Sequence, residues 1–523
     1  MARTESPLAR DPRRGRAHGA QLTPGPASFR LPRGAVIAVL AGLLLKLALL
    51  LAVHTARPEG VVYIDTGTYV RPARALLSRG TFSPSPERAP EPEINRTPGF
   101  PLLIAAVYGL FGEKAWLLSL VGVLASAGTG LAAASLAARL AGPRAAVLSA
   151  AIATFDPGSF VRSIDLLSDS TFAFLLIAAL ALLVRGVDRA GTGGADPLLA
   201  GLVLAAATLV RPITYYAVPI LLVVAGVAVS RRTASPRRGI AAACAFLLAP
   251  LLLLGGWQVR NGLRAGTFQF APIGGSMLLF FWAAPVQARV EGLPLTQVQE
   301  RLGDRERWWR QGGAEKESDI FPGESYARLF PETSRLSLPE LSRRWSRQGI
   351  DILRAHPVET VRTAMHGSVL LLLVPANLIA GTQHGLIHPT PEALHAWEDQ
   401  DLRRVAATFP RAHPAASTVA VVLVLLNAGL LLLAARGVAG IPFRASGWRH
   451  APLLATFLYL VPVSAGAASI DDRFRLPLVP ILAIYAGSAL ARAAMAPAAN
   501  SITPATPCAP GKAHHGSALH SGA

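Results

Sequence analysis

Long apolar runs restrict this chain to a membrane environment. The run at 35–53 reads AVIAVLAGLLLKLALLLAV, and the run at 416–435 reads ASTVAVVLVLLNAGLLLLAA. Each approaches the roughly 20 residues that a helix needs to cross a hydrocarbon core about 30 Å thick. Only 15% of the 523 residues are charged, compared with about 25% in ordinary soluble domains. The sequence therefore predicts a polytopic integral membrane protein of the all-α class, built as a transmembrane helical bundle.

The net charge of +19 lies largely in short loops between the apolar runs. Residues 1–33 hold seven arginines, and the loop RRTASPRR at 231–238 has four arginines and no acid. The positive-inside rule places such loops in the cytoplasm. We therefore expect a cytoplasmic N-terminus, an uncleaved first span and no binding of nucleic acid.

Turn-forming residues divide the apolar runs into an expected ten to thirteen spans. The recognisable runs lie at about 34–54, 115–138, 143–162, 166–184, 197–210, 212–230, 239–256, 364–381, 415–435, 451–469 and 476–494. Counting crossings from the N-terminus places 55–113 and 257–360 outside. The basic loop 436–450 should be cytoplasmic. Two apolar runs separate it from the outer insert, and two crossings would return the chain to the outside. Either one run lies in the interface or a span is hidden, for example within 268–285.

The chain divides into five expected segments. They are a basic cytoplasmic segment (1–33), a transmembrane module with a catalytic first outer loop at 55–113 (34–285), an outer-face insert with an amphipathic helix near 339–355 (286–360), C-terminal transmembrane helices (361–495) and a disordered tail (496–523). The two cysteines support neither a disulfide framework nor a zinc site.

Ionisable residues near the membrane are costly and mark candidate functional sites. Those of this chain gather at the expected outer face and comprise Asp65, Arg96, Asp165, Asp169, Arg211, Arg260, Asp471, Asp472, Arg473 and Arg475. Loops on one face of a bundle converge, so we expect one cavity that holds both carboxylates and guanidinium groups. The planar fork of arginine binds phosphate oxygens in a bidentate way.

The first outer loop is the most informative stretch. Asp65 and Tyr69 lie one helical turn apart in an expected short helix at 66–79 that ends before Gly80. A proline-rich linker then leads to Arg96-Thr97-Pro98-Gly99-Phe100-Pro101. One interpretation is that Asp65 only caps the helix, since Asp is a favoured N-cap residue.

Five segments, in order along the chain, resemble the GT-C superfamily of membrane glycosyltransferases. The resemblance is to bacterial family-39-like enzymes, which are related to protein O-mannosyltransferases and lipid A aminoarabinose transferases. The segments are the Asp65 loop through Phe111-Gly112, SIDLLSDSTFAFLLIAALALLVR (163–185), ATLVRPITYY (207–216), GGWQVRNGLRAGTF (255–268) and DDRFRLPLVPILAIYAG (471–487). Together they cover about 60–490 apart from 286–360.

The resemblance implies a multi-pass enzyme of the bacterial inner membrane with its active site on the outer face. Such an enzyme transfers a hexose or pentose from a polyprenyl-phosphate donor to a lipid, glycan or protein acceptor. The resemblance places the catalytic acid at Asp65 and the phosphate-binding base at Arg96. The other expected donor-binding residues are Tyr69, Asp169, Arg211, Arg260, Asn261, Arg473 and Arg475.

One departure from the family pattern concerns metal use. Several relatives carry two adjacent acids at the first site, whereas Thr66 follows Asp65 here. A second carboxylate could come from Glu93 or Asp169, which leaves open whether a divalent cation takes part.

Two other function classes remain as alternatives. A transporter or flippase of lipid-linked saccharides would use the same arginines to hold phosphate without breaking the glycosidic bond. It predicts internal pseudo-symmetry, but the sequence shows no clear repeat. A scaffold without activity predicts that Asp65 points away from any cavity.

Overall fold

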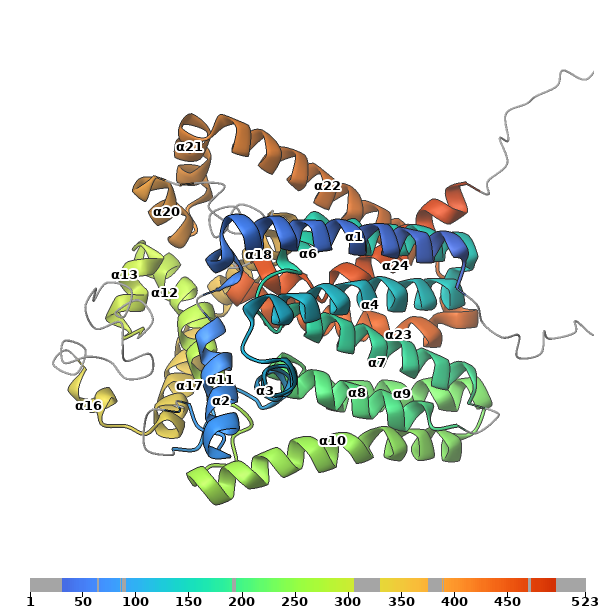
Figure 1. Cartoon of the computed structure of the whole chain (residues 1–523), viewed down its shortest axis with the longest axis horizontal. Helices are drawn as coiled ribbons and strands as arrows, with labels where there is room; N and C mark the ends of the chain where they lie inside the picture. The colour runs from blue at the N-terminus through green and yellow to red at the C-terminus, as the bar shows by residue number, and fades with distance from the viewer. Residues whose placement is uncertain are drawn as a thin grey trace, which may run out of the picture.

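The computed structural model describes residues 31–63, 65–84, 86, 91–190, 194–304, 330–374, 388, 390–468 and 472–494. Every element in these ranges is helical. Long helices run side by side as a bundle, and shorter helices gather at one end of it (Figure 1). The prediction of an all-α fold is confirmed. The N-terminal 30 residues, Asp471 and the tail from 495 lie outside the described residues.

The bundle takes helices from both halves of the chain. The first half contributes α1 (Arg33–Ala56), α4 (Ala115–Ala141), α5 (Pro143–Phe155), α7 (Asp169–Asp188), α8 (Asp196–Val210), α9 (Ala217–Thr233) and α10 (Pro236–Ala265). The second half contributes α18 (Pro357–Leu373), α22 (Pro414–Ala439), α23 (Phe443–Ala468) and α24 (Val479–Ala493). Proline opens α5, α10, α18 and α22, because its fixed φ suits the first helical position, where no intrahelical N–H bond is needed.

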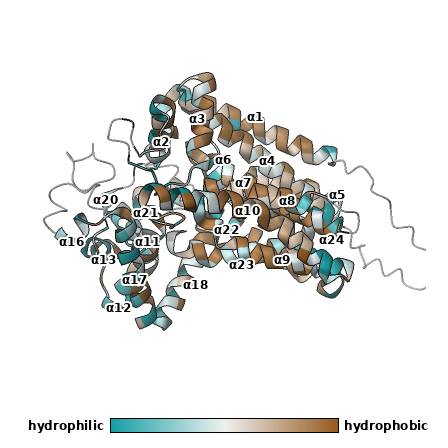
Figure 2. Ribbon diagram, turned by 90° about the horizontal axis from the view of Figure 1, so that it is seen from below, coloured by the Kyte–Doolittle hydropathy of each residue, from teal (hydrophilic) through white to brown (hydrophobic). Residues whose placement is uncertain are grey.

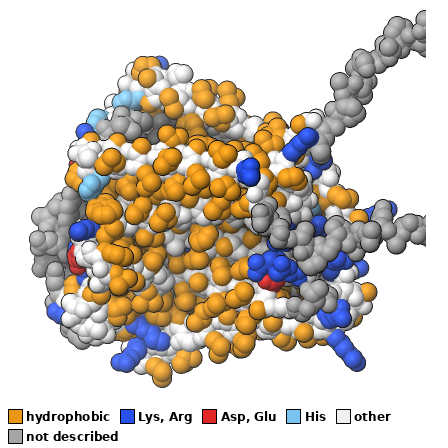
Figure 3. Space-filling model, turned by 45° about the vertical axis from the view of Figure 1, so that its right-hand side comes forward, with side chains coloured by type: hydrophobic (Ala, Val, Ile, Leu, Met, Phe, Trp, Pro, Cys, Tyr) orange, Lys and Arg blue, Asp and Glu red, His pale blue; other side chains and the backbone are white. Residues whose placement is uncertain are grey.

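Five described helices are long and apolar enough to cross a membrane, namely α1, α4, α7, α10 and α22. Four shorter apolar helices are α3 (Gly99–Phe111), α5, α8 and α24. The bundle helices are mostly hydrophobic (Figure 2). In the view of Figure 3, hydrophobic side chains cover the middle of the surface, whereas Lys and Arg lie toward its ends. The chain is therefore a multi-pass integral membrane protein, and its expected ten to thirteen spans remain a prediction.

Close packing of the bundle relies on small residues at helix crossings. A Cβ atom on Gly437 of α22 would lie 2.0 Å from the carbonyl oxygen of Tyr485 in α24. One on Gly201 of α8 would lie equally close to the carbonyl oxygen of Phe246 in α10. Glycine at these positions lets the helix backbones approach, as in other membrane bundles.

The shorter helices form a layer at one end of the bundle, which we call the outer layer (Figure 1). It contains α2 (Thr66–Arg79), α11 (Ile273–Ser276), the π-helical turn η3 (Met277–Ala283), α12 (Ala284–Glu291), α13 (Leu295–Arg301), α16 (Pro331–Ser334), α17 (Leu338–Ala355), α20 (Pro391–Glu398) and α21 (Leu402–Ala412). The expected amphipathic helix near 339–355 is α17, which packs buried Leu341 and Trp345 against Phe280. A capping box between Ser337 and Glu340 starts this helix.

The two ends of the bundle differ in the elements that they carry. Both α17 and α20 lie at the outer-layer end in Figure 1. The helices α22 and α23 meet at the opposite end, which carries the basic loop 436–450. There Arg449 pairs with Asp188 at 2.8 Å and donates to the carbonyl of Arg139 at 2.9 Å. Residues 268–285 contribute α11 and η3 to the outer layer.

Candidate active site

Asp65 directly precedes α2, but its side chain serves a different purpose from a helix cap. The carboxylate makes no capping hydrogen bond. Instead, Arg96 donates from Nη2 to Oδ1 at 2.8 Å, and Arg473 donates from Nη2 to Oδ2 at 2.6 Å. The Asp65 side chain is 22% exposed. The interpretation of Asp65 as a cap alone is therefore wrong, and both its oxygens are occupied by guanidinium groups.

This double ion pair controls the acidity of the Asp65 carboxyl. Burial by itself would raise the pKa of Asp65, because it penalises the charged form. The guanidinium groups of Arg473 and Arg96 outweigh burial and hold the pKa well below its usual range. In the state that the structure describes, Asp65 is therefore ionised and only weakly basic.

The linker before α3 holds Arg96 in place. The side chain of Glu93 accepts hydrogen bonds from the backbone N–H groups of Asn95 at 2.6 Å and Arg96 at 2.9 Å. The Arg96 guanidinium lies 4.7 Å from the centre of the Tyr69 ring and donates to its hydroxyl at 3.3 Å. Tyr69 in turn packs edge-on against Phe100. Contacts with Asp65, Tyr69 and Glu93 thus fix the position of the Arg96 guanidinium group.

Arg473 reaches the site from η4 (Asp472–Arg475), close to the C-terminal end of the described chain. Its guanidinium lies 5.0 Å from the centre of the Tyr63 ring and 5.4 Å from that of Phe474. The other neighbour of Tyr63 is Arg162, 5.4 Å from the ring, which forms a buried ion pair with Asp165. Sequence patterns did not single out Tyr63 or Arg162, since an aromatic ring between two arginines is formed only by the fold.

Arg211 and Asp169 form a further ion pair, between the end of α8 and the start of α7. Their side chains are 13% and 3% exposed. The Arg211 guanidinium also lies 5.1 Å from the centre of the Phe474 ring, so Phe474 contacts both Arg211 and Arg473. The structure therefore brings Asp65, Tyr69, Arg96, Asp169, Arg211 and Arg473 together at one place.

Arg260 and Asn261 bind loop backbone at the edge of this cluster. Arg260 donates to the carbonyl of Glu93 at 2.6 Å and to that of Phe82 at 3.2 Å. Asn261 is fully buried and donates to the carbonyl of Gln269 at 3.0 Å. Arg260 thus fastens the linker that carries Arg96, and Asn261 fastens the turn after α10.

Arg475, the last residue of η4, is buried and lies apart from the Asp65 cluster. It is 4% exposed and donates from Nη1 to Oδ1 of Asp156 at 3.0 Å. The other oxygen of Asp156 accepts from the backbone N–H of Ser159 and caps α6 (Pro157–Arg162). This pair anchors the segment that carries Arg473. Sequence patterns indicated only a turn-forming role for Asp156, because its partner is distant in the chain.

The two acids considered as a second carboxylate have other partners. Glu93 binds its own linker and is buried, which raises the pKa of its carboxyl. Asp169 pairs with Arg211. Within the described ranges, no group of three or more His, Cys, Asp and Glu residues could hold a metal ion. The site as described is dominated by arginine, the side chain that suits phosphate recognition.

Comparisons with known proteins found one family match and several solved structures of low similarity. Residues 95–254 match the family described as dolichyl-phosphate-mannose-protein mannosyltransferase, whereas no curated protein sequence matches the chain. The oligosaccharyltransferase of Archaeoglobus fulgidus in the apo form is 14% identical at a TM-score of 0.44, with 88% of this chain and 50% of that chain covered. ArnT from Cupriavidus metallidurans bound to undecaprenyl phosphate is 16% identical at a TM-score of 0.38, with 87% and 78% covered.

This chain therefore spans half the length of the Archaeoglobus protein. The family match includes Arg96, Asp169 and Arg211 of the cluster and the helices that carry them. Residues 95–254 of this chain are therefore similar to the dolichyl-phosphate-mannose-protein mannosyltransferase family.

Proposed function

We propose that this protein transfers a sugar from a polyprenyl-phosphate donor to an acceptor hydroxyl at the outer face of the membrane. The observation that carries the proposal is the pair of guanidinium groups, from Arg96 and Arg473, that bind the two oxygens of Asp65. A carboxylate beside two phosphate-binding forks has the parts that glycosyl transfer from a phosphate needs. The family match adds support, because the family is described by a lipid-phosphate sugar donor.

Asp65 acts as the general base in this proposal. The acceptor hydroxyl oxygen forms a bond to the anomeric carbon of the sugar, and its proton passes to Asp65. The bond from the anomeric carbon to the phosphate oxygen breaks, and its electron pair stays on that oxygen. The sugar passes through an oxocarbenium-like transition state, and positioned proton transfer typically contributes on the order of 10²–10⁴-fold to such rates.

Arg96, Arg473 and Arg211 stabilise the leaving phosphate, which gains negative charge as the bond breaks. The donor phosphate competes with Asp65 for the forks of Arg96 and Arg473. When these forks move to the phosphate, Asp65 loses its nearest positive charges and its pKa rises. One exchange of ion pairs therefore binds the donor and makes the carboxylate a stronger base.

The remaining predicted site residues receive supporting roles. Tyr69 orients Arg96, and Asp169 orients Arg211, through the contacts described above. Arg260, Asn261 and Arg475 hold the loops that carry the site. We place the outer layer outside a bacterial inner membrane and the N-terminus in the cytoplasm, with a hexose or pentose as the transferred group.

The test is sugar transfer from a radiolabelled polyprenyl-phosphate sugar by the full chain in its membrane. Formation of labelled acceptor by the wild type, and its loss in Asp65→Asn, is the expected result. The alternative, a transporter of lipid-linked saccharides, predicts that the label crosses the membrane while it stays on the polyprenyl phosphate. That outcome would overturn the proposal.

A further inference from the structure

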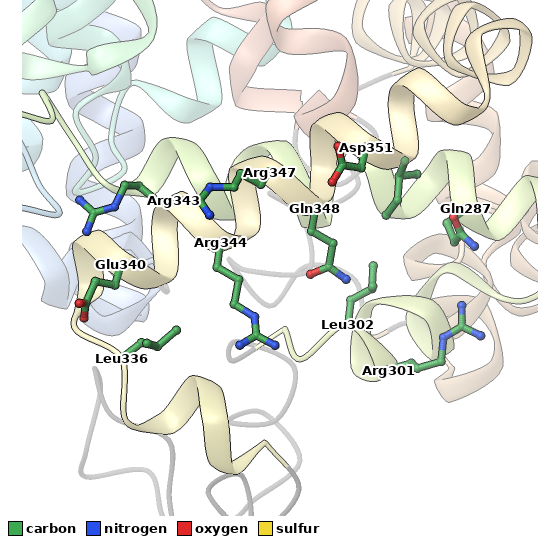
Figure 4. A pocket seen from close by; sticks show the side chains of 11 residues that line it. Gln287, Arg301, Leu302, Leu336, Glu340, Arg343, Arg344, Arg347, Gln348 and Asp351 are labelled. Carbon is green, nitrogen blue, oxygen red and sulfur yellow. The ribbon is translucent and has the colours of Figure 1, made fainter.

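A second polar site lies in the outer layer, apart from the Asp65 cluster. It is a cavity of about 750 Å³ between α17 and the pair α12 and α13 (Figure 4). This volume falls within the roughly 300–1,000 Å³ of typical ligand sites. The apolar lining residues Leu302, Leu336 and Ile352 pack against the core around Phe280 and Trp345. The cavity thus has a packed base under its polar walls.

Arginine dominates the polar walls. Arg301 comes from α13, and Arg343, Arg344 and Arg347 come from α17. The two acids of the lining, Glu340 and Asp351, stand eleven positions apart on α17, roughly 16 Å along the helix axis. Between them, α17 presents only arginine and glutamine to the cavity. Like charges three or four positions apart destabilise a helix by a few tenths of a kcal/mol per pair, and a bound anion removes that repulsion.

Among the described residues, the guanidinium groups of the cavity differ in how firmly they are paired. Arg344 pairs with Glu332 at 3.0 Å, but Glu332 is 78% exposed, and exposed pairs of this kind contribute little stability. Arg301 pairs with Glu291, whose side chain is less exposed. Arg343 and Arg347 form no ion pair within the part of the chain that the structure describes. In Figure 4, Gln348 extends from α17 toward Leu302 and Arg344 extends below the same helix, whereas Arg343 and Arg347 point along α17, away from Arg301. The lining comes from both α17 and α13.

The cavity is connected to the Asp65 cluster through a short chain of contacts. Ser342, on the buried side of α17, donates to the carbonyl of Pro272 at 2.6 Å. Two residues earlier, the carbonyl of Phe270 accepts from Trp257 at 2.9 Å. The centre of the Trp257 ring lies 4.7 Å from the guanidinium carbon of Arg260. Arg260 in turn binds the backbone of the linker that carries Arg96. Residues near the C-terminal end of α10 therefore contact both the segment that supports the cavity wall and the linker that carries Arg96.

We propose that this cavity binds a phosphate or carboxylate group carried by the saccharide acceptor, and so selects negatively charged acceptors. The inference rests on the proposed glycosyltransferase function and deepens it, because it names the chemical class of the acceptor. Arginine forks bind both anions in a bidentate way. The polar amides of Gln287 and Gln348 line the same space and suit sugar hydroxyls.

Binding of three matched sugars tests the inference directly. Glucose, glucuronic acid and glucose 6-phosphate differ in charge but little in size. Each is titrated calorimetrically into the full chain in detergent, with undecaprenyl phosphate present to fill the donor site. We expect both anionic sugars to bind at least about tenfold more tightly than glucose, which is a difference of one decade in Kd. The comparison of glucuronic acid with glucose 6-phosphate separates carboxylate from phosphate recognition.

Two variants locate the binding. Arg343→Gln/Arg347→Gln should weaken binding of the anionic sugars by about tenfold or more. The matched control is Arg354→Gln, which removes an exposed arginine of the same helix that does not line the cavity. It should bind as the wild type does. Equal affinity for the three sugars, or an equal loss in the control, overturns the proposal.

Competition during catalysis distinguishes this inference from the proposed function. In membranes that contain the full chain, glucose 6-phosphate should inhibit transfer of label to endogenous acceptors, and glucose should not. The Arg343→Gln/Arg347→Gln variant should need about tenfold more glucose 6-phosphate for the same inhibition. Absence of any transfer in the wild type counts against the proposed function. Transfer that glucose 6-phosphate does not inhibit counts against the charged acceptor alone.

Discussion

Arg473 donates a hydrogen bond of 2.6 Å to Asp65, although the two residues stand 408 positions apart in the chain. The contact joins the last short helix before α24 to the loop before α2. With Arg96 on the other oxygen, it leaves the carboxylate charged and weakly basic. In the proposed reaction, this ion pair makes the basicity of Asp65 dependent on the donor.

Asp65→Asn separates the proposed role of Asp65 as general base from its role as hydrogen-bond partner of Arg96 and Arg473. The amide has almost no basicity near neutral pH, so transfer should fall by on the order of 10²-fold or more. Donor binding should be retained or tightened, because Arg96 and Arg473 no longer share their charge with a carboxylate. Radiolabel transfer and binding of the donor are measured in parallel. Asp188→Asn, at the opposite end of the bundle, is the control, and full activity of Asp65→Asn would return the residue to a structural role.

Arg96→Ala should abolish most donor use while the protein still inserts into the membrane. Arg96→Lys should restore only part of the activity, since an ammonium offers a point charge instead of a planar fork. The measurement is the KM for the polyprenyl-phosphate donor, alongside protein level in the membrane. Wild-type rates in both variants would show that Arg96 does not bind the phosphate.

The pH dependence of Arg473→Gln tests the ion pair on Asp65. In the wild type, two guanidinium groups hold the pKa of Asp65 below its usual range, so kcat/KM for the donor should show no loss from this group down to about pH 4. Removing Arg473 raises the pKa, and the fall of kcat/KM on the acid side should therefore begin at a higher pH. The profile is recorded with donor below saturation, where it reports on the free enzyme. An unshifted or oppositely shifted profile contradicts the assignment.

The buried pair of Arg475 and Asp156 should contribute strongly to stability. Asp156→Asn keeps a side-chain oxygen for capping α6 but leaves the Arg475 guanidinium without its counter-charge, at a cost of about 3–5 kcal/mol. Thermal unfolding of the purified protein should therefore occur at a lower temperature, with reduced transfer because Arg473 shares the segment. The exposed pair of Arg74 and Glu113 provides the control, since Glu113→Gln should cost about 1 kcal/mol or less.

A second variant tests whether Asp156→Asn lowers stability through the lost ion pair or through another structural effect. Arg475→Met, combined with Asp156→Asn, removes the unpaired charge and should recover much of the lost stability. Failure of the double variant to unfold at a higher temperature than Asp156→Asn would mean that the ion pair is not what holds the segment.

Orientation is tested by labelling single cysteines in a chain without Cys244 and Cys508. Lys114→Cys, after α3, should react with an impermeant thiol reagent added from outside. Arg237→Cys, at the start of α10, should react only after the membrane is opened. Both positions are exposed. Labelling of both from the same side would refute the orientation and the outer-face site.

The sequence alone was sufficient to predict the helical membrane fold and the helix at 66–79. These features depend on local hydrophobicity and on turn residues, which are read from neighbouring positions. Asp65, Arg96 and Arg473 were also found as candidates, because charges near a membrane are rare and their motifs resemble a known superfamily. The order of these motifs along the chain carried the resemblance.

Only the tertiary structure decided how the charges are paired. Arg475 differs from Arg473 by two positions, yet one is buried against Asp156 and the other binds Asp65. Arg260 carries the same charge as Arg96, yet it binds the backbone of Glu93. Opposite charges attract in every direction, so a sequence that holds ten such groups permits many pairings. Helix packing selects one of them, because it fixes the few angstroms over which a guanidinium can reach a carboxylate.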